Sequence, residues 1–270
     1  MAPENSIERF SQMKNTDNAL NRETLIQRAM SVLRSRRLKC FRGTDVTEIE
    51  RKVTAYYASH SGGDYYARLA EQHLWDDMIR RKNFESYCQT ANDILDFGCG
   101  AGGLTVALAE HFPDKRIHAI DIGAHAAALI SSSTATIDFR QGSVLDAPFA
   151  GDSIDMLISR FVIEHTIHPD KLISEAHRIL KPNGIFYLLY PQLLLKVTFP
   201  TAFREVLSWI FNPSQLTYLD PQIGATTSDA DDQDAVWLTN PVKIATLLKR
   251  SGFKIISHVP TQSLVIARKS

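Results

Sequence analysis

The stretch ILDFGCGAGG, residues 94–103, decides the fold of this 270-residue chain. A short apolar run ends at Asp96, glycines follow at 98, 100, 102 and 103, and a helical pattern opens at Leu104. Glycine lets the backbone take positive φ and lets a ligand approach closely, because it has no Cβ. The free N–H groups at the start of a helix face such a ligand. The stretch therefore predicts a buried strand, a tight turn and a helix at a ligand site, a pattern that nicotinamide and flavin enzymes also use.

Four further segments follow this turn in a fixed order. They are RIHAIDI (116–122), DFRQGSVLDAPF (138–149), SIDMLISRFVIEH (153–165) and HRILKPNGIFYL (177–188). Together with the glycine turn they resemble the class I S-adenosylmethionine-dependent methyltransferases, above all the broad group that methylates small molecules. That group carries a D-x-G-x-G-x-G turn and an R-x-L-K-P-x-G signature. The resemblance covers roughly residues 92–190, with a weaker echo at 240–268, and it implies S-adenosyl-L-methionine as cofactor and a small-molecule acceptor.

Apolar runs and helical patterns alternate through this part of the chain. We expect strands at 94–97, 116–120, 137–141, 154–159, 184–190, 253–259 and 262–268. We expect helices at 102–111, 124–131, 169–181 and 240–251. Such alternation predicts an α/β fold in which right-handed crossovers wind a parallel sheet. Because only residues 260–261 separate the last two runs, the expected fold is a Rossmann-like, mostly parallel seven-stranded sheet with helices on both faces and an antiparallel last strand.

The remaining segments predict additions to this core. Helical patterns at Arg22–Leu38, Thr47–Ala58 and Tyr65–Asn83 indicate an N-terminal helical cap over residues 1–90. The core then spans 91–192 and is completed by a helix and an antiparallel strand pair in 239–270. The pattern breaks in 193–238, where a long proline-containing segment follows the fifth strand. We interpret it as an inserted lid over the acceptor site, with a surface excursion as the alternative.

Composition narrows the classes of partner. Thirty basic residues balance thirty acidic ones, whereas nucleic-acid enzymes usually carry a basic surplus. We therefore expect no nucleic-acid partner. Cysteines at 40, 88 and 99 form no C-x-x-C pair and suit a reducing compartment. No apolar run is long enough to span a membrane, so we expect a cytoplasmic enzyme without a membrane span, whose oligomeric state the sequence does not predict.

The resemblance implies roles for the residues that hold the cofactor. Asp96 would accept from the cofactor's ammonium group, and Asp121, at the end of the second strand, would accept from both ribose hydroxyls. Alternatively, Asp96 is a helix cap and Asp121 a turn residue. Ser143 stands where many relatives carry an Asp that binds the adenine amino group, and Asp146 is an alternative acceptor. The full set of expected cofactor-binding residues is Asp96, Gly98, Cys99, Gly100, Gly102, Asp121, Ile122, Ser143, Val144 and Arg160. Ile122 and Val144 would sandwich the purine or pack in the core.

The acceptor side is predicted from residues near the fourth strand, near the N-terminus and in the insertion. His165 follows the fourth strand where many relatives carry Glu-His, so it is the candidate general base for a hydroxyl acceptor. A histidine that merely orders the loop is the alternative. Glu164, His165 and His168 have metal-ligand spacing, but Phe161 replaces the first carboxylate of metal-dependent relatives, so no metal is expected. Candidate substrate residues are Tyr56, Tyr57, Tyr65, Tyr66, Phe203 and Leu207; the tyrosines suit core packing equally well.

We favour O-methylation over N-methylation of the small-molecule acceptor. A protein or nucleic-acid methyltransferase is the alternative, although residues 159–162 read SRFV instead of the Asn/Asp-Pro-Pro-Tyr of base amino methylation. The Pro-Cys pair of cytosine-C5 enzymes is absent as well. A protein of this fold that binds the cofactor without transferring methyl also stays open.

Overall fold

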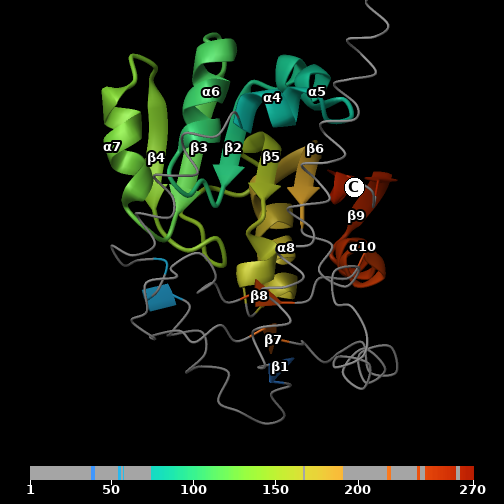
Figure 1. The fold of residues 1–270 in the computed structure, drawn as a ribbon. Coiled ribbons are helices and arrows are strands. Elements are labelled where there is room, and N and C mark those ends of the chain that lie inside the picture. Colours follow the sequence, from blue (N-terminus) through green and yellow to red (C-terminus); the bar gives the residue numbers. More distant parts are fainter. Residues whose placement is uncertain are drawn as a thin grey trace, which may run out of the picture.

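The body of the molecule is a seven-stranded sheet covered by helices on both faces (Figure 1). A computed structural model describes residues 38–39, 54–55, 57, 74–166, 168–190, 218–219, 236–237, 241–259 and 262–270. The strands of the main sheet are β2 (Asp93–Phe97), β3 (Arg116–Asp121), β4 (Ile137–Gln141), β5 (Ile154–Arg160), β6 (Leu180–Leu189), β9 (Phe253–Val259) and β10 (Leu264–Lys269). Their order is β4-β3-β2-β5-β6-β10-β9. Strand β10 pairs antiparallel with both of its neighbours, and the other pairs are parallel, which confirms the predicted fold class.

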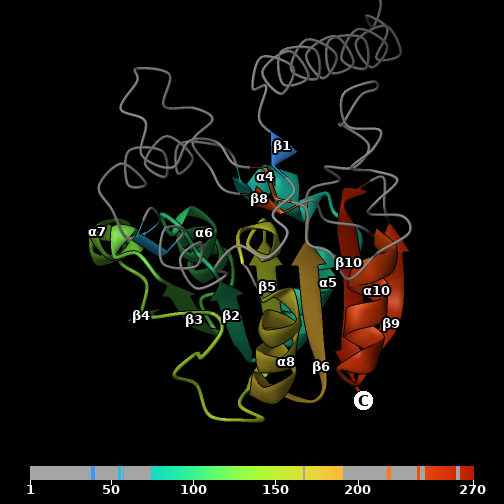
Figure 2. The same ribbon diagram turned by 90° about the horizontal axis from the view of Figure 1, so that it is seen from below.

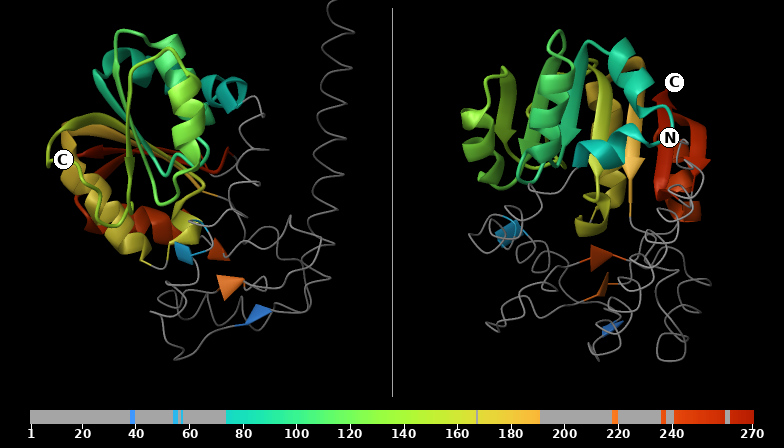
Figure 3. Two further views of the ribbon diagram at one scale, coloured as in Figure 1. Left: turned by 90° about the vertical axis from the view of Figure 1, so that its left-hand side faces the viewer. Right: turned by 45° about the horizontal axis from the view of Figure 1, so that its top comes forward.

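Helices cover the two faces of this sheet in two groups (Figure 3). The described helices are α4 (Leu74–Ile79), α5 (Phe84–Thr90), α6 (Gly103–His111), α7 (His125–Ser132), the 3-10 turn η1 (Ile163–His165), α8 (Pro169–Ile179) and α10 (Pro241–Arg250). Helices α4, α5, α6 and α7 lie on one face, and α8 and α10 lie on the other. This arrangement explains why all five residues of β2 are buried, because a central parallel strand is covered on both faces.

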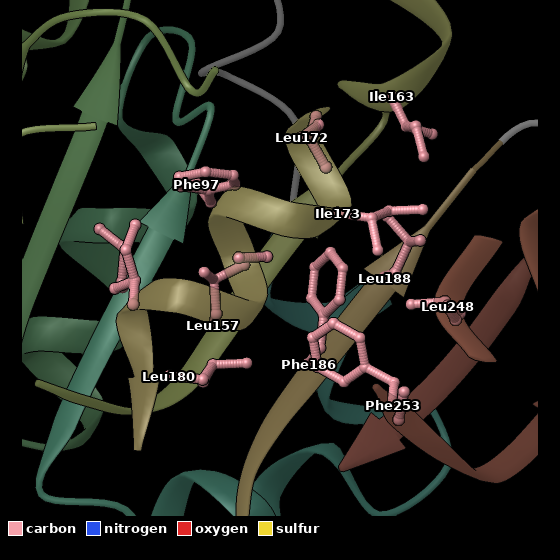
Figure 4. Packing of buried hydrophobic residues seen from close by; sticks show 14 of the residues in the cluster. Phe97, Leu157, Ile163, Leu172, Ile173, Leu180, Phe186, Leu188, Leu248 and Phe253 are labelled. Atoms are coloured by element: carbon pink, nitrogen blue, oxygen red, sulfur yellow. The ribbon is translucent and has the colours of Figure 1, made fainter. Parts of the chain in front are cut away.

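Alternate residues of each strand enter two separate hydrophobic clusters. On β2, Ile94 packs in the cluster that includes Met78 of α4 and Leu108 of α6. Its neighbour Leu95 packs in the cluster of α8 and α10, as the two-residue period of a strand requires. Figure 4 shows the second cluster, in which Ile173 of α8 and Leu248 of α10 meet β6. Both clusters together fix the sheet that carries the site.

The described helices and strands differ from the sequence prediction at several points. Leu38, expected at the end of a helix, lies in a short strand, Leu38–Lys39. One helix was expected over Tyr65–Asn83, but α4 ends at Ile79 and a second helix, α5, begins at Phe84. Asn83 between them has φ 56°, a left-handed conformation that asparagine tolerates and that interrupts a helix. Strand β6 begins at Leu180 instead of residue 184, because Leu180 already pairs with Ile154 of β5. Helix α8 accordingly ends at Ile179.

A second, small sheet joins segments that are far apart in the chain. Its strands are β1 (Leu38–Lys39), β7 (Tyr218–Leu219) and β8 (Val236–Trp237), paired antiparallel in the order β1-β7-β8. Figures 1 and 2 show it on the side toward which the strands of the main sheet point, and β8 lies against η1. Residues 38–39 therefore meet residues 218–219 and 236–237 on the side of the carboxyl edge of the main sheet.

No helix in the described part of the chain is both long enough and apolar enough to cross a membrane.

Candidate cofactor and acceptor site

The strand order places the candidate site at the centre of the carboxyl edge. The chain crosses from β2 to β3 and β4 on one side, and β5 and β6 lie on the other. In open α/β sheets, ligands bind outside the carboxyl ends of the strands where the order reverses in this way. The segments that follow β2, β3 and β5 meet at that point. They carry Asp96, Asp121 and the pair Glu164 and His165.

The glycine turn after β2 has the conformation that its sequence predicts. Gly98, Gly100 and Gly102 have φ values of 89°, 57° and 84°, which side chains rarely tolerate. A Cβ built on Gly98 would lie 2.4 Å from Cγ2 of Val162, in the loop after β5. The turn after β2 is therefore packed directly against the loop that carries the acceptor-side residues.

Asp96 is a buried acid with one hydrogen-bond donor beside it. Asp96 is only 2% exposed, and its Oδ2 accepts a hydrogen bond from Thr105 Oγ1 at 2.7 Å. The pKa of Asp96 is raised to about 6, mainly by burial; the Thr105 hydrogen bond opposes this rise, and the nearby charge of Asp121 adds to it. A cationic group bound here would favour the ionised carboxylate.

Asp121 connects the turns after β2 and β3. Its Oδ2 accepts from the Gly100 N–H at 2.8 Å, and its Oδ1 accepts from the Gly123 N–H at 2.9 Å. Burial raises the pKa of Asp121, and these two backbone bonds oppose that shift. Each carboxylate oxygen has a further lone pair, so Asp121 both orders the turns and retains the capacity to accept from a ligand.

The residues expected on the adenine side, Ser143, Val144 and Ile122, all have contacts within the chain. The Oγ of Ser143 accepts from the Leu145 N–H at 3.1 Å, so this hydroxyl helps to order its own turn. Val144 is partly buried against the hydrophobic cluster of α8 and α10. Ile122 is half-buried, and its carbonyl accepts from Gln141 Nε2 at 3.2 Å. Val144 therefore has the core contact that the sequence left open as an alternative.

Cys99 lies within the glycine turn. Burial raises the pKa of its thiol well above the ordinary value, and the negative charges of Asp96 and Asp121 act in the same direction. A thiol in these surroundings stays protonated and is a poor nucleophile.

Arg160, the last residue of β5, and Phe161, the first residue of the loop after it, have unusual surroundings and backbone conformation, respectively. Phe161 has φ 55°, and its N–H donates to the Leu189 carbonyl at 3.0 Å. The guanidinium carbon of Arg160 lies 4.8 Å from the centre of the Phe161 ring. The Arg160 Nε is buried and has no hydrogen-bond partner among the described residues. Burial lowers the pKa of Arg160, and the charges of Asp77, Asp96 and Glu164 partly offset this.

Turn η1 carries the acceptor-side acid and base. Ile163 anchors it in the cluster of α8 and α10 (Figure 4). The next residue, Glu164, is only 3% exposed, and burial raises its pKa to about 8. His165 Nε2 lies 3.7 Å from Glu164 Oε1, too far for a hydrogen bond. On the other side of the ring, Nδ1 of His165 is 2.7 Å from the hydroxyl of Tyr57.

Tyr57 links both sides of the glycine turn. Its backbone carbonyl accepts from His125 Nε2 at 3.0 Å, just after β3, while its hydroxyl meets His165 after β5. Because β2 lies between β3 and β5, Tyr57 spans the edge where β2 ends. The structure thus brings together one expected substrate residue and the expected base. Tyr56, Tyr65, Tyr66, Phe203 and Leu207 lie outside the described residues.

Sequence reasoning did not identify two contacts of the site. Thr105 hydrogen-bonds Asp96 from the first turn of α6, and His125 fixes the carbonyl of Tyr57. A threonine in the first turn of the helix after a glycine-rich loop was a weak signal for the former, and nothing in the sequence indicated the latter. In the described part of the chain, no group of three His, Cys, Asp or Glu residues could hold a metal ion, and metal independence stays a prediction.

Comparisons with known proteins indicate the class of enzyme. Residues 95–188 match the model of a family described as a methyltransferase domain. A probable S-adenosylmethionine-dependent methyltransferase from Mycolicibacterium smegmatis is 25% identical over 70% of this chain and 71% of its own length. A demethylmenaquinone methyltransferase from Chlorobaculum parvum is 24% identical over 65% of this chain and 73% of its own length. In fold, the chain is similar to a methyltransferase structure from Methanosarcina mazei, with TM-score 0.51, 18% identity and coverage of 70% and 97% of the two chains.

The sheet order, the glycine turn and the family match define an enzyme of the Rossmann-like methyltransferase class. The chain is a class I S-adenosylmethionine-dependent methyltransferase, and S-adenosylmethionine is its cofactor.

Proposed function

We propose that this enzyme methylates a small molecule, with an oxygen nucleophile favoured over nitrogen. The observation that carries the proposal is the contact of the Tyr57 hydroxyl with Nδ1 of His165, at 2.7 Å, in the loop that packs against the glycine turn. A hydroxyl acceptor must lose a proton as it is methylated, and an imidazole held in a fixed orientation is suited to take it. The similarity to demethylmenaquinone methyltransferases supports a small acceptor.

The donor set of the carboxyl edge fits the charged groups of the cofactor. Asp96 would accept from the ammonium group, and Asp121 would accept from the ribose hydroxyls. Arg160, whose Nε lacks a partner among the described residues, would donate to the carboxylate. Gly98, Cys99, Gly100 and Gly102 would leave room for the cofactor, and Ile122, Ser143 and Val144 would border the adenine. When bound, the cofactor supplies an electrophilic methyl group on a sulfonium.

The chain's own residues would then position the acceptor and exclude water. In methyl transfer from a good leaving group, orientation is the main contribution that a protein can make. His165 would accept the proton of a hydroxyl acceptor. Tyr57 would orient the imidazole through Nδ1. We also propose that residues 1–90 form a helical cap and that 193–238 form the lid. The contact of β8 with η1 supports that position for the lid.

Mass spectrometry of a metabolite extract tests the proposal. The extract is incubated with the enzyme and with cofactor labelled in its methyl group, and a naphthoquinol is added to one sample as a defined acceptor. We expect a labelled methyl group on one or more small molecules. The Asp121→Ala variant is the matched control and should give much less label when the cofactor concentration is kept below its weakened affinity. Label found only on protein or nucleic acid would contradict the proposal, and the absence of label from every fraction would favour a binding protein.

A further inference from the structure

Glu164 differs from every other buried acid that the structure describes. The buried acids are Asp93, Asp96, Asp121 and Glu164, with exposed fractions of 6%, 2%, 7% and 3%. Asp93 is paired with cations, Asp96 accepts from Thr105, and both oxygens of Asp121 accept backbone N–H groups. By contrast, the Oε2 of Glu164 is buried without any hydrogen-bond partner among the described residues.

The unpartnered atom does not stand alone. In the described part of the chain, three buried side-chain polar atoms lack partners: Ser159 Oγ, Arg160 Nε and Glu164 Oε2. All three belong to the end of β5 and to η1, at the point where the strand order reverses. Buried polar groups are satisfied in the great majority of cases, so a cluster of unsatisfied ones indicates a missing partner. The carboxyl edge is where ligands of such sheets bind.

Packing around Glu164 explains why the chain itself does not satisfy it. Ile163 holds the start of η1 in the hydrophobic cluster (Figure 4), and Val162 is pressed against Gly98. The backbone of η1 is thus fixed from two sides. The other carboxyl oxygen of Glu164, Oε1, lies 3.7 Å from His165 Nε2. One oxygen is therefore near the candidate base, and the second is left for a group that enters from outside.

We propose that Glu164 binds the methyl acceptor directly, with Oε2 accepting a hydrogen bond from the O–H or N–H group that becomes methylated. This inference rests on the proposed function and adds a substrate-binding residue to it. It also restricts the substrate class: the reacting oxygen or nitrogen of the acceptor carries a hydrogen atom. An acceptor whose reacting atom has only lone pairs, such as a tertiary amine, would leave the buried carboxyl unpartnered and should be excluded.

The cofactor analogue sinefungin provides a probe that does not require the acceptor. It carries a carbon with an amino group where the cofactor carries the methylated sulfur, so its N–H groups stand where methyl transfer occurs. S-adenosylhomocysteine is the matched ligand without that group. Calorimetry measures the two dissociation constants. Their ratio shows whether the protein has a hydrogen-bond acceptor at the point of methyl transfer, and this measurement does not depend on turnover.

In the wild-type enzyme we expect sinefungin to bind more tightly than S-adenosylhomocysteine. Glu164→Gln should weaken sinefungin binding by about tenfold or more, because a charge-assisted hydrogen bond is lost. Binding of S-adenosylhomocysteine should change by less than about twofold. Glu110→Gln, an exposed glutamate at the far end of α6, is the control and should change neither constant. The dissociation constant of sinefungin for Glu164→Asp should lie between those for the wild type and for Glu164→Gln.

An unchanged ratio in Glu164→Gln would overturn the inference, because Oε2 would then face something other than the acceptor. In that case the proposed function stands as long as S-adenosylhomocysteine still binds. If neither ligand binds to the wild-type enzyme, the cofactor assignment fails and the inference falls with it. Thermal unfolding of each variant, measured without ligand, separates a loss of binding from a failure to fold.

Discussion

Buried acids occur at both edges of the main sheet, and the two edges treat them in opposite ways. At the amino edge, Asp93 accepts two bonds from Arg116, at 2.6 and 2.7 Å, and one from Lys181 at 2.9 Å. The Arg116 hydrogen bond, with smaller contributions from Lys181 and His118, holds the pKa of Asp93 far below its ordinary value. At the carboxyl edge, burial raises the pKa of Asp96 to about 6 and that of Glu164 to about 8.

This difference in pKa separates acids that stabilise the fold from acids that we expect to bind a ligand. An acid that is paired with cations within the chain stays ionised and adds stability to the folded state. An acid that is buried without a cation destabilises the folded chain in its ionised form. Such acids are concentrated at functional sites, where a bound cation or hydrogen-bond donor compensates for the cost. The comparison therefore predicts that substitutions at the two edges change different measurable quantities.

The largest expected effect is on turnover. His165→Ala should lower kcat by about 10²–10⁴-fold, because the acceptor hydroxyl would lose its general base. Cofactor affinity should stay close to that of the wild type. Steady-state kinetics with the acceptor found by mass spectrometry measure this effect. His165→Gln should recover little, because an amide orients but does not take a proton.

His118→Ala is the matched control at the amino edge. The side chains of His118 and His165 are 17% and 18% exposed, and each has an acid within reach. The ring nitrogens of His118 lie 3.0 Å from Asp138 and 3.4 Å from Asp93, which begins β2 at the amino edge. The variant should lose stability and keep its kcat. A loss of turnover below about tenfold in His165→Ala would make His165 a structural residue.

A second effect is on the pH dependence of stability, through Glu164. Its pKa is raised from 4.5 to about 8 in the folded chain. The folded state then holds a proton that the unfolded state releases, so this stabilisation is complete below about pH 4.5 and is lost as the pH rises to about 8. Between these limits, the free energy of unfolding of Glu164→Gln relative to wild type should rise by about 1.4 kcal/mol per pH unit.

Denaturant titrations at several pH values between 5 and 8 measure this slope. Glu110→Gln, which removes an exposed carboxyl, should run parallel to the wild type. A parallel line for Glu164→Gln as well would show that Glu164 is hydrated or paired in solution.

The sequence predicted the main sheet well and the site only in part. Strand β4 was predicted at the observed residues, and Asp96 and Asp121 lie next to and at the carboxyl ends of β2 and β3, where the apolar runs before them had placed them. The end of α4 at Ile79 and the whole of helix α5 were missed, because α5 has only seven residues, too few for a clear helical period in the sequence. The pairing of Tyr57 with His165 was missed too. The two residues are far apart in sequence, so only tertiary packing brings them together.

A third effect concerns cofactor affinity. Asp121→Ala should weaken binding of S-adenosylmethionine by about 1.5–3 kcal/mol, because two ribose hydroxyls would lose a charged acceptor. The loss of its bonds to Gly100 and Gly123 would also loosen the two turns. Calorimetry measures the affinity. Asp138→Ala, at the amino end of the neighbouring strand β4, is the control and should leave it unchanged. Unchanged affinity in Asp121→Ala would show that this acid only orders the turns.

The smallest expected effect is at the amino edge. Asp93→Asn should lower the free energy of unfolding by about 1–2 kcal/mol at pH 7, since it removes charge-assisted bonds to Arg116 and Lys181. The effect is modest because the side chain of Arg116 is 69% exposed and its pairing is screened by water. The pKa of Asp93 is lowered in the folded state, so its contribution is present above the ordinary pKa of 3.8 and is lost as the pH falls below that value. The gap between the two denaturation curves should therefore narrow from pH 5 to pH 3. Cofactor affinity should stay within about twofold of wild type, because the site is at the opposite edge. A gap that widens toward low pH, or a clear loss of affinity, would break the division between a stabilising edge and a ligand-binding edge.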